Sequence, residues 1–281
     1  MNDSLWLAWS ADPTALFGIP LAAILYARGL RSLERRRIHD KRRTASFYIG
    51  LIALFVALVS PLDALSDELF LAHMGQHMLL MFFAVPAMQI GAPVIPLMRG
   101  IPRPIRRRVA IPIFKSPLVR SALRNLFRPL IAWPLFIGII IGWHFPVAYE
   151  AALRNEAIHL LEHLTFALGA YLWWWNVIDP FPLRASLSYL ARVPFVFITI
   201  VPTFVLGAFL TFAPNPFYPH YEATAPAYGL TALEDQQIGG VTMWIPGSFV
   251  VAAALLLSLY YAVRYEQQQQ LARERAMDAS P

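Results

Sequence analysis

Long runs of apolar residues alternate with short polar segments along most of this chain of 281 residues. A helix needs about 20 apolar residues to cross the hydrocarbon core of a membrane. Runs close to this length predict seven transmembrane helices, over residues 12–29, 45–60, 70–95, 129–145, 157–178, 191–213 and 241–263. The second run is short because Ser60 and Pro61 follow it, and Pro86, Pro93 and Pro96 predict a kink or an early end in the third.

Basic residues fall almost entirely on one side of the predicted helices. If the N-terminus is outside, every one of the 23 lysines and arginines except Arg154 lies in an inner segment. Because Lys and Arg are retained on the cytoplasmic side, we expect an outer N-terminus and a cytoplasmic C-terminus. The predicted fold is an all-α, polytopic membrane helix bundle, with one domain over residues 1–265 and a polar cytoplasmic tail over residues 266–281.

Composition agrees with an integral membrane protein, since 58% of the residues are hydrophobic and only 14% are charged. The formal net charge of +6 is typical also of nucleic-acid-binding proteins. Here the basic clusters lie at the ends of apolar runs, where membrane topology and anionic lipid headgroups account for them. We therefore expect membrane lipid, and no nucleic acid, among the partners. The first apolar run shows no basic lead and no cleavage site, so it is not expected to be a signal peptide.

The chain contains no cysteine, which excludes disulfides, thiolate metal sites and cysteine nucleophiles. No other nucleophile, phosphate-binding loop or paired-carboxylate arrangement stands out in the sequence. The sequence therefore favours a protein that is not an enzyme, and any soft metal ligand in it must be methionine.

Five of the seven histidines lie at the same end of three predicted helices: His73, His77, His144, His159 and His163. The stretches HMGQH and HLLEH each place two histidines four residues apart, about 400° of helical rotation, so each pair shares one helix face. Imidazoles are costly to bury in a membrane without a partner, which predicts a metal or haem site near the outer surface. Alternatively, the histidines are ordinary polar residues that form hydrogen bonds at the membrane interface. This alternative explains a single pair better than it explains two pairs at one depth.

Further side chains near the histidines are candidate auxiliary ligands or supports of the imidazoles. Met81 follows the first pair on the same helix face, and Met74, Met78 and Met88 are weaker candidates. Asp63 and Glu162 are candidates for holding the imidazole tautomers. His39 in an inner loop and His220 in an outer loop are expected to be surface residues, with His220 a lesser candidate as an auxiliary ligand.

These donor atoms are compatible with more than one bound group. Imidazole with thioether and no thiolate suits copper best, whereas zinc would use the histidines and ignore the methionines. Haem is the competitor, because two histidines on facing helices can supply both axial ligands. Haem propionates usually need basic partners, however, and the outer side offers only Arg154.

Eight short motifs follow one another in a distinctive order. They are SPLDALSD, HMGQHMLLM, PAMQIGAP, WHFP, HLLEH, WWWNVIDP, YPHYE and LEDQQIGGVTMW. In these motifs and their spacing, roughly residues 45 to 265 resemble the multispan CtaG family of cytochrome c oxidase assembly factors.

The resemblance implies a seven-span protein of the bacterial inner membrane that is needed to build an active aerobic cytochrome c oxidase. It implies copper handling for the metal centres of the oxidase, with oxidase subunits and a copper donor on the outer side as partners. The matching positions are the five histidines, Asp63, Asp235, Gln236, Gly239 and Gly240. We expect Asp235 and Gln236 to cap the seventh helix or to reach the site, and the glycines to form a tight turn entering that helix.

The expected mechanism is ligand exchange, in which an outer donor passes copper to imidazoles at an exposed rim and an oxidase subunit then takes it. The outer loop over residues 214–240 is long enough to act as a lid or a docking surface. Two alternatives stay open. A haem-binding membrane electron-transfer protein would use the same histidines, and a copper transporter would need ligands across the membrane, where the sequence offers only methionines.

Overall fold

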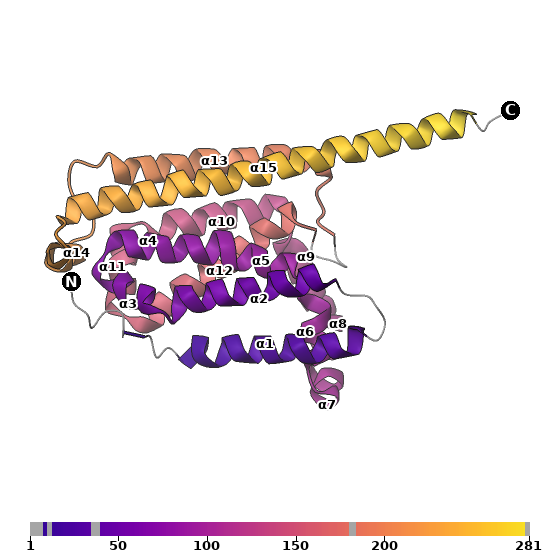
Figure 1. The fold of residues 1–281 in the computed structure, drawn as a ribbon, viewed down its shortest axis with the longest axis horizontal. Coiled ribbons are helices and arrows are strands. Elements are labelled where there is room, and N and C mark those ends of the chain that lie inside the picture. Colours follow the sequence, from indigo (N-terminus) through magenta and orange to yellow (C-terminus); the bar gives the residue numbers. More distant parts are fainter. Residues whose placement is uncertain (1–7, 10–12, 35–39, 180–183, 279–281) are drawn as a thin grey trace.

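The computed structural model describes residues 8–9, 13–34, 40–179 and 184–278, and every regular element among them is a helix (Figure 1). The long helices lie side by side in one bundle. They are α1 (Pro13–Glu34), α2 (Lys41–Leu58), α10 (Pro129–Trp143), α12 (Glu156–Val177), α13 (Tyr189–Thr211) and α15 (Ala232–Asp278). A further long element consists of α4 (Phe70–Leu79), a π-helical turn (Leu80–Ala84) and α5 (Val85–Ile90).

Short helices connect the long ones. Those at the end of the bundle that holds the histidines are α3 (Pro61–Glu68), α11 (Pro146–Arg154), α14 (His220–Thr224) and a 3₁₀ turn (Ala225–Tyr228). The others are α6 (Val94–Gly100), α7 (Arg103–Ile105), a second π-helical turn (Arg106–Ala110), α8 (Ile111–Lys115) and α9 (Pro117–Leu126). His39, expected to be a surface residue, lies outside the described residues.

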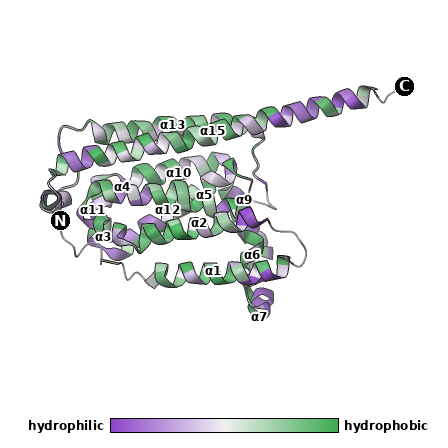
Figure 2. Ribbon diagram, in the orientation of Figure 1, coloured by the Kyte–Doolittle hydropathy of each residue, from purple (hydrophilic) through white to green (hydrophobic). Residues whose placement is uncertain are grey.

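Among the described residues, four helices are long and apolar enough to cross a membrane, and six spans result if each of two bent helix pairs counts as one. Hydropathy colouring shows apolar residues along most of each long helix and polar residues in the last part of α15 (Figure 2). α12 is not among these candidates, although it has 22 residues, because its histidines and Glu162 make it less apolar.

The SPLD motif ends one helix and begins the next. The side chain of Ser60 accepts a hydrogen bond from the backbone N–H of Leu62, and Pro61 occupies the first turn of α3, where it needs no N–H partner. This N-cap explains why α2 stops at Leu58 and bends by 43° into α3. The predicted break at residues 60–61 is therefore confirmed.

The third predicted span ends early, as its prolines predict. It runs from Phe70 to Ile90 and not to residue 95, because Gly91 closes the helix and Ala92 has a φ of +50°, which no helix tolerates. The chain then turns into α6. Within the span, the N–H of Val85 bonds to the carbonyl of Leu80, five residues back, which is the π-helical pattern.

The last helix begins earlier than predicted. α15 begins at Ala232, so the predicted outer loop of residues 214–240 is helical in its final part. The prediction of a tight turn at Gly239 and Gly240 is wrong, because both lie inside α15. Instead they allow close helix packing: a Cβ on Gly239 would collide with the Phe70 ring on α4, and one on Gly240 would lie 2.6 Å from Thr211 Oγ1 on α13.

Candidate metal centre

Two helices bring four imidazoles together inside the bundle. His73 and His77 lie on α4, and their ring centroids are 4.3 Å apart; His159 and His163 on α12 have the same separation. Across the two helices, the centroids of His73 and His159 lie 5.4 Å apart, as do those of His77 and His163. The two predicted pairs thus face each other at one depth and form a compact group of four rings.

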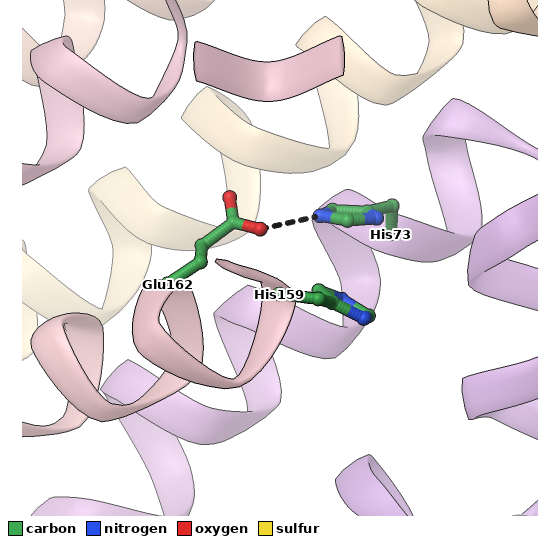
Figure 3. Close-up of side chains that lie close together, drawn as sticks. All are labelled: His73, His159 and Glu162. Carbon is green, nitrogen blue, oxygen red and sulfur yellow. Dashed lines mark ion pairs between the residues drawn. The ribbon is translucent and has the colours of Figure 1, made fainter. Parts of the chain in front are cut away.

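Glu162 lies among these rings. Its Oε2 is 3.7 Å from Nε2 of His73, and its Oε1 is 3.9 Å from Nε2 of His77. One ligand atom each from His73, His159 and Glu162 lie within 4.8 Å of one another (Figure 3). Histidine nitrogen and carboxylate oxygen at such separations can share one metal ion after small side-chain adjustments.

Most of the group is buried, in contrast to the expected exposed rim, and only His159 is partly exposed. His73 is 0% exposed, His77 2% and Glu162 1%. Helices α3, α11 and α14 lie at the same end of the bundle as the N-termini of α4 and α12 (Figure 1). The predicted exposure is therefore not found at His73 and His77, whereas His159 keeps part of its surface exposed.

Several polar atoms of this group have no hydrogen-bond partner in the protein. They are both ring nitrogens of His73 and of His77, both carboxylate oxygens of Glu162, and Nε2 of His163. Each buried polar group without a partner costs about 1–3 kcal/mol. A bound cation would take one nitrogen lone pair from a neutral imidazole and an oxygen of Glu162 as ligands, so the residues present fit a metal ion.

His144 lies at the end of α10, outside the group centred on Glu162. Its Nδ1 is 2.7 Å from the carbonyl oxygen of Ile140, and its Nε2 is 3.4 Å from the sulfur of Met74. A carbonyl oxygen only accepts, so Nδ1 carries the proton and Nε2 of the neutral ring has a free lone pair. Nε2 and a thioether sulfur therefore face each other as two potential ligands.

The sequence matches the cytochrome c oxidase caa3 assembly factor family (Caa3_CtaG) over residues 24–264. The chain belongs to this family. The resemblance found in the motifs is thereby confirmed, and the family description is that of an assembly factor for cytochrome c oxidase. No solved structure matches the chain.

Curated relatives of the chain come from mycobacteria. The chain is 26% identical to the uncharacterised protein Mb0105 of Mycobacterium bovis and to MT0111 of Mycobacterium tuberculosis, over 79% of this chain and 34% of each relative. It is 23% identical to ML1998 of Mycobacterium leprae, over 85% of this chain and 37% of that protein. The chain spans about a third of the length of these curated relatives.

Asp235 supports the site from a distant part of the chain. Its two carboxylate oxygens accept hydrogen bonds from the backbone N–H groups of Phe70 and Leu71, at 2.6 Å and 3.0 Å. Leu69 at the N-terminus of α4 provides no capping side chain, so Asp235 on α15 caps α4 instead. His73 lies in this first turn, so the cap fixes the position of a candidate ligand.

The expectation that Asp235 and Gln236 cap their own helix is wrong. Thr231 and Glu234 form a capping box there, because the Glu234 N–H donates to Thr231 Oγ1 and the Thr231 N–H donates to Glu234 Oε2. The hydrogen bonds to the exposed Glu234 lower the pKa of its carboxyl group. Gln236 accepts a hydrogen bond from the N–H of Phe217 and thereby holds the outer loop.

Asp63 and Met81 also lie beside the site. Gln76 donates hydrogen bonds to Oδ1 of Asp63 at 2.6 Å and to the carbonyl of Ala57 at 2.8 Å. Because Gln76 is in the turn between His73 and His77, Asp63 fixes the rotation of α4. Met81 is 3% exposed, and its carbonyl accepts a hydrogen bond from the indole of Trp174.

Buried tyrosines, which the sequence analysis did not identify, close the end of the site next to α3 and the end of α10. The hydroxyl of Tyr218 donates to the carbonyl of His144 at 2.9 Å, and the hydroxyl of Tyr221 donates to the carbonyl of Ser66 at 3.1 Å. The Tyr149 ring lies 5.0 Å from that of His73. Tyr221 belongs to the YPHYE motif, whose tyrosines in a predicted loop were a signal for a packed segment. His220, in the same motif, has Nε2 within 2.8 Å of the Asp67 carbonyl.

Proposed function

We propose that this assembly factor holds one copper ion between α4 and α12 and passes it to cytochrome c oxidase while the oxidase is built. The observation that supports this function is the set of unpartnered donor atoms on His73, His77 and Glu162 in an apolar interior. Family membership supports the oxidase as the recipient. Copper is the cargo in this proposal, so no catalytic step is needed.

Charge and ligand softness favour monovalent copper over zinc. A carboxylate and neutral imidazoles give a site of charge −1, which a monovalent ion neutralises and a divalent ion would overcompensate in a low-dielectric interior. Met74 beside Nε2 of His144 adds a thioether, and thioethers select monovalent copper. The contacts among the four rings also favour an ion, because a porphyrin would need open space between facing imidazoles.

The proposal includes a seven-span topology with an outer N-terminus and a location in the bacterial inner membrane. α12 is taken as the additional span, because 22 helical residues extend about 33 Å, enough for a hydrocarbon core of about 30 Å. The basic residues then lie inside and the histidines lie in the outer leaflet.

Release requires the outer end to open. The segment that carries Tyr218, His220 and Tyr221 is held to α3 by hydrogen bonds from His220, Tyr221 and Thr224 to backbone carbonyls, and to the end of α10 by one from Tyr218. A copper donor or an oxidase subunit that displaces this segment would expose His144 and Met74 first. In this mechanism the segment acts as a lid over the site.

The first experiment measures copper binding by purified, metal-free protein. We expect about one copper per chain with no Soret absorption, and at least 10- to 100-fold weaker binding in His73→Ala and His163→Ala, since loss of supporting groups alone costs that much. The control is His220→Ala, which removes an outer histidine that bonds to a backbone carbonyl. Met74→Leu should weaken copper binding and leave zinc binding unchanged.

Two outcomes would overturn the proposal. A Soret band without bound copper would assign the histidines to haem, and equal copper binding by His220→Ala and His73→Ala would assign binding to the surface. In cells, a deletion strain should lose cytochrome c oxidase activity, and added copper should restore it. A deletion strain with full oxidase activity in copper-limited medium would remove the functional part of the proposal.

A further inference from the structure

A second polar centre lies at the opposite end of the bundle from the histidines. There α2, α5, α12, α13 and α15 surround a cavity of about 720 Å³. In Figure 1 the N-terminus of α13 and the C-terminus of α12 lie at the far end from α3, α11 and α14. The volume falls in the range of about 300–1,000 Å³ that is typical of small-molecule sites.

The lining of this cavity is divided between apolar and polar residues. Phe82, Trp174 and Ala254 form a buried part of its lining, and the apolar Val250 and Ala253 lie beside them on α15. Other lining residues are polar or charged: Arg43, Asp179, Tyr189, Arg192 and Tyr261. A ligand that fills this cavity must therefore combine an apolar body with a polar end.

Arg192 is the most unusual member of the lining. It is only 4% exposed, and it donates hydrogen bonds to the carbonyl of Val177 at 3.0 Å and to Oδ1 of Asp179 at 2.7 Å. Its Nε–H has no partner. The guanidinium lies 4.5 Å from the centre of the Tyr189 ring, which holds it in place. A rigid, buried guanidinium with a donor to spare suits recognition of a phosphate.

The charge of Asp179 does not remove this preference for an anion. Partial burial raises the pKa of Asp179, but the hydrogen bonds from Arg192 and from the N–H of Ala185, together with the charge of Arg192, outweigh burial and lower the pKa below the ordinary value. Asp179 therefore stays ionised and balances one positive charge, while the lining contains two arginines, Arg43 and Arg192.

The cavity opens toward the apolar exterior. Phe83, Ile90, Leu257 and Tyr261 line it and are each 50% exposed or more, as expected for side chains at its mouth between α5 and α15. A molecule dissolved in the membrane can therefore enter from the side.

We propose that this cavity binds one anionic phospholipid, with the phosphate at Arg192 and Arg43 and an acyl chain along Phe82, Trp174 and Ala253. The site is separate from the histidine cluster and does not depend on copper handling. The phosphate is the group that Arg recognises, and the mostly apolar lining assigns it to a lipid rather than to free inorganic phosphate. Basic pockets between transmembrane helices on the cytoplasmic side typically bind such headgroups.

Native mass spectrometry of the full-length protein, exchanged from nanodiscs of phosphatidylglycerol or phosphatidylcholine, tests this site. We expect one phosphatidylglycerol to stay bound and phosphatidylcholine to be lost. Arg43→Gln should bind the anionic lipid about fivefold more weakly, equivalent to about 1 kcal/mol for one basic residue. Ala253→Phe should exclude the lipid by filling the cavity at an exposed position.

The matched control is Arg42→Gln, which removes the same charge from an exposed position outside the cavity and should leave lipid binding unchanged. Equal weakening by Arg42→Gln and Arg43→Gln would show a general surface charge effect and overturn the proposal. Equal retention of both lipids would also overturn it, and so would retention of phosphatidylglycerol by Ala253→Phe. In thermal unfolding, the proposal fails if inorganic phosphate stabilises the protein as much as phosphatidylglycerol does.

Discussion

At the scale of single residues, the costly feature of this protein is a carboxylate buried among imidazoles. Glu162 is 1% exposed, and neither of its oxygens accepts a hydrogen bond. An uncompensated buried charge destabilises a fold by several kcal/mol in the absence of a bound counterion. Neutralising this carboxylate should therefore stabilise the metal-free protein and weaken copper binding.

We expect Glu162→Gln to raise the thermal unfolding midpoint of the metal-free protein and to weaken copper binding about 10- to 100-fold. The amide has nearly the shape of the carboxyl group but no charge to desolvate. Thermal unfolding and copper titration of the same preparation measure both effects. Glu156→Gln, an exposed position on the same helix, should change neither. A lower unfolding midpoint in Glu162→Gln would mean that the carboxylate serves the fold.

Asp235 supports the site through its hydrogen bonds to the backbone of α4. Asp235→Ala removes both acceptors from the first turn of α4, so it should lower stability by about 1–2 kcal/mol and weaken copper binding by displacing His73. Asp235→Asn keeps one acceptor and should retain most of both properties. Glu234→Ala breaks only the capping box of α15 and serves as the control. If Asp235→Ala bound copper like the wild type, the cap would not position the ligand.

At the scale of elements, the π-helical turn in the third span has a cause in sequence. Pro86 has no N–H, so in the π-helical pattern the carbonyl of Met81, five residues earlier, loses its helical partner. The indole N–H of Trp174 on α12 occupies this carbonyl at 2.9 Å. The proline and the tryptophan therefore act together, and they fix α4 and α12 against each other directly below the histidines.

Close packing between α4 and α15 depends on one glycine. Gly239→Ala would place a methyl group against the Phe70 ring and within 3.2 Å of Leu71 Cα, so we expect a loss of about 1–3 kcal/mol. Gly75→Ala is the matched control: it lies between His73 and His77, has no neighbouring atom within 4 Å, and should be neutral or slightly stabilising. Thermal unfolding compares them. Equal unfolding midpoints for the two variants would show that α4 and α15 can move apart without loss of stability.

At the scale of the whole molecule, local patterns predicted the helices and the facing histidines, but not the contacts between distant segments. The four-residue spacing of His73 and His77 is a local property, and so is the break at Pro61. The cap that Asp235 provides to α4 joins residues 165 positions apart. In the sequence, Asp235 looks like an ordinary polar residue at the start of its own helix. Likewise, the tyrosines of residues 217–221 were expected in a loop, and only tertiary packing shows that they cover the site.

The number of spans depends on α12, and the absence of cysteine makes a direct test possible. If α12 crosses the membrane, Glu156→Cys and Arg184→Cys, at exposed positions on either side of it, lie on opposite faces. In intact cells an impermeant maleimide should label Glu156→Cys and the outer control Glu222→Cys. It should label Arg184→Cys and the tail control Gln269→Cys only after permeabilisation. The reason is that the inner segments hold nearly all the basic residues. Labelling of residues 156 and 184 from the same face would show that α12 does not cross the membrane. The histidine cluster and the phospholipid cavity would then belong to a protein with six spans.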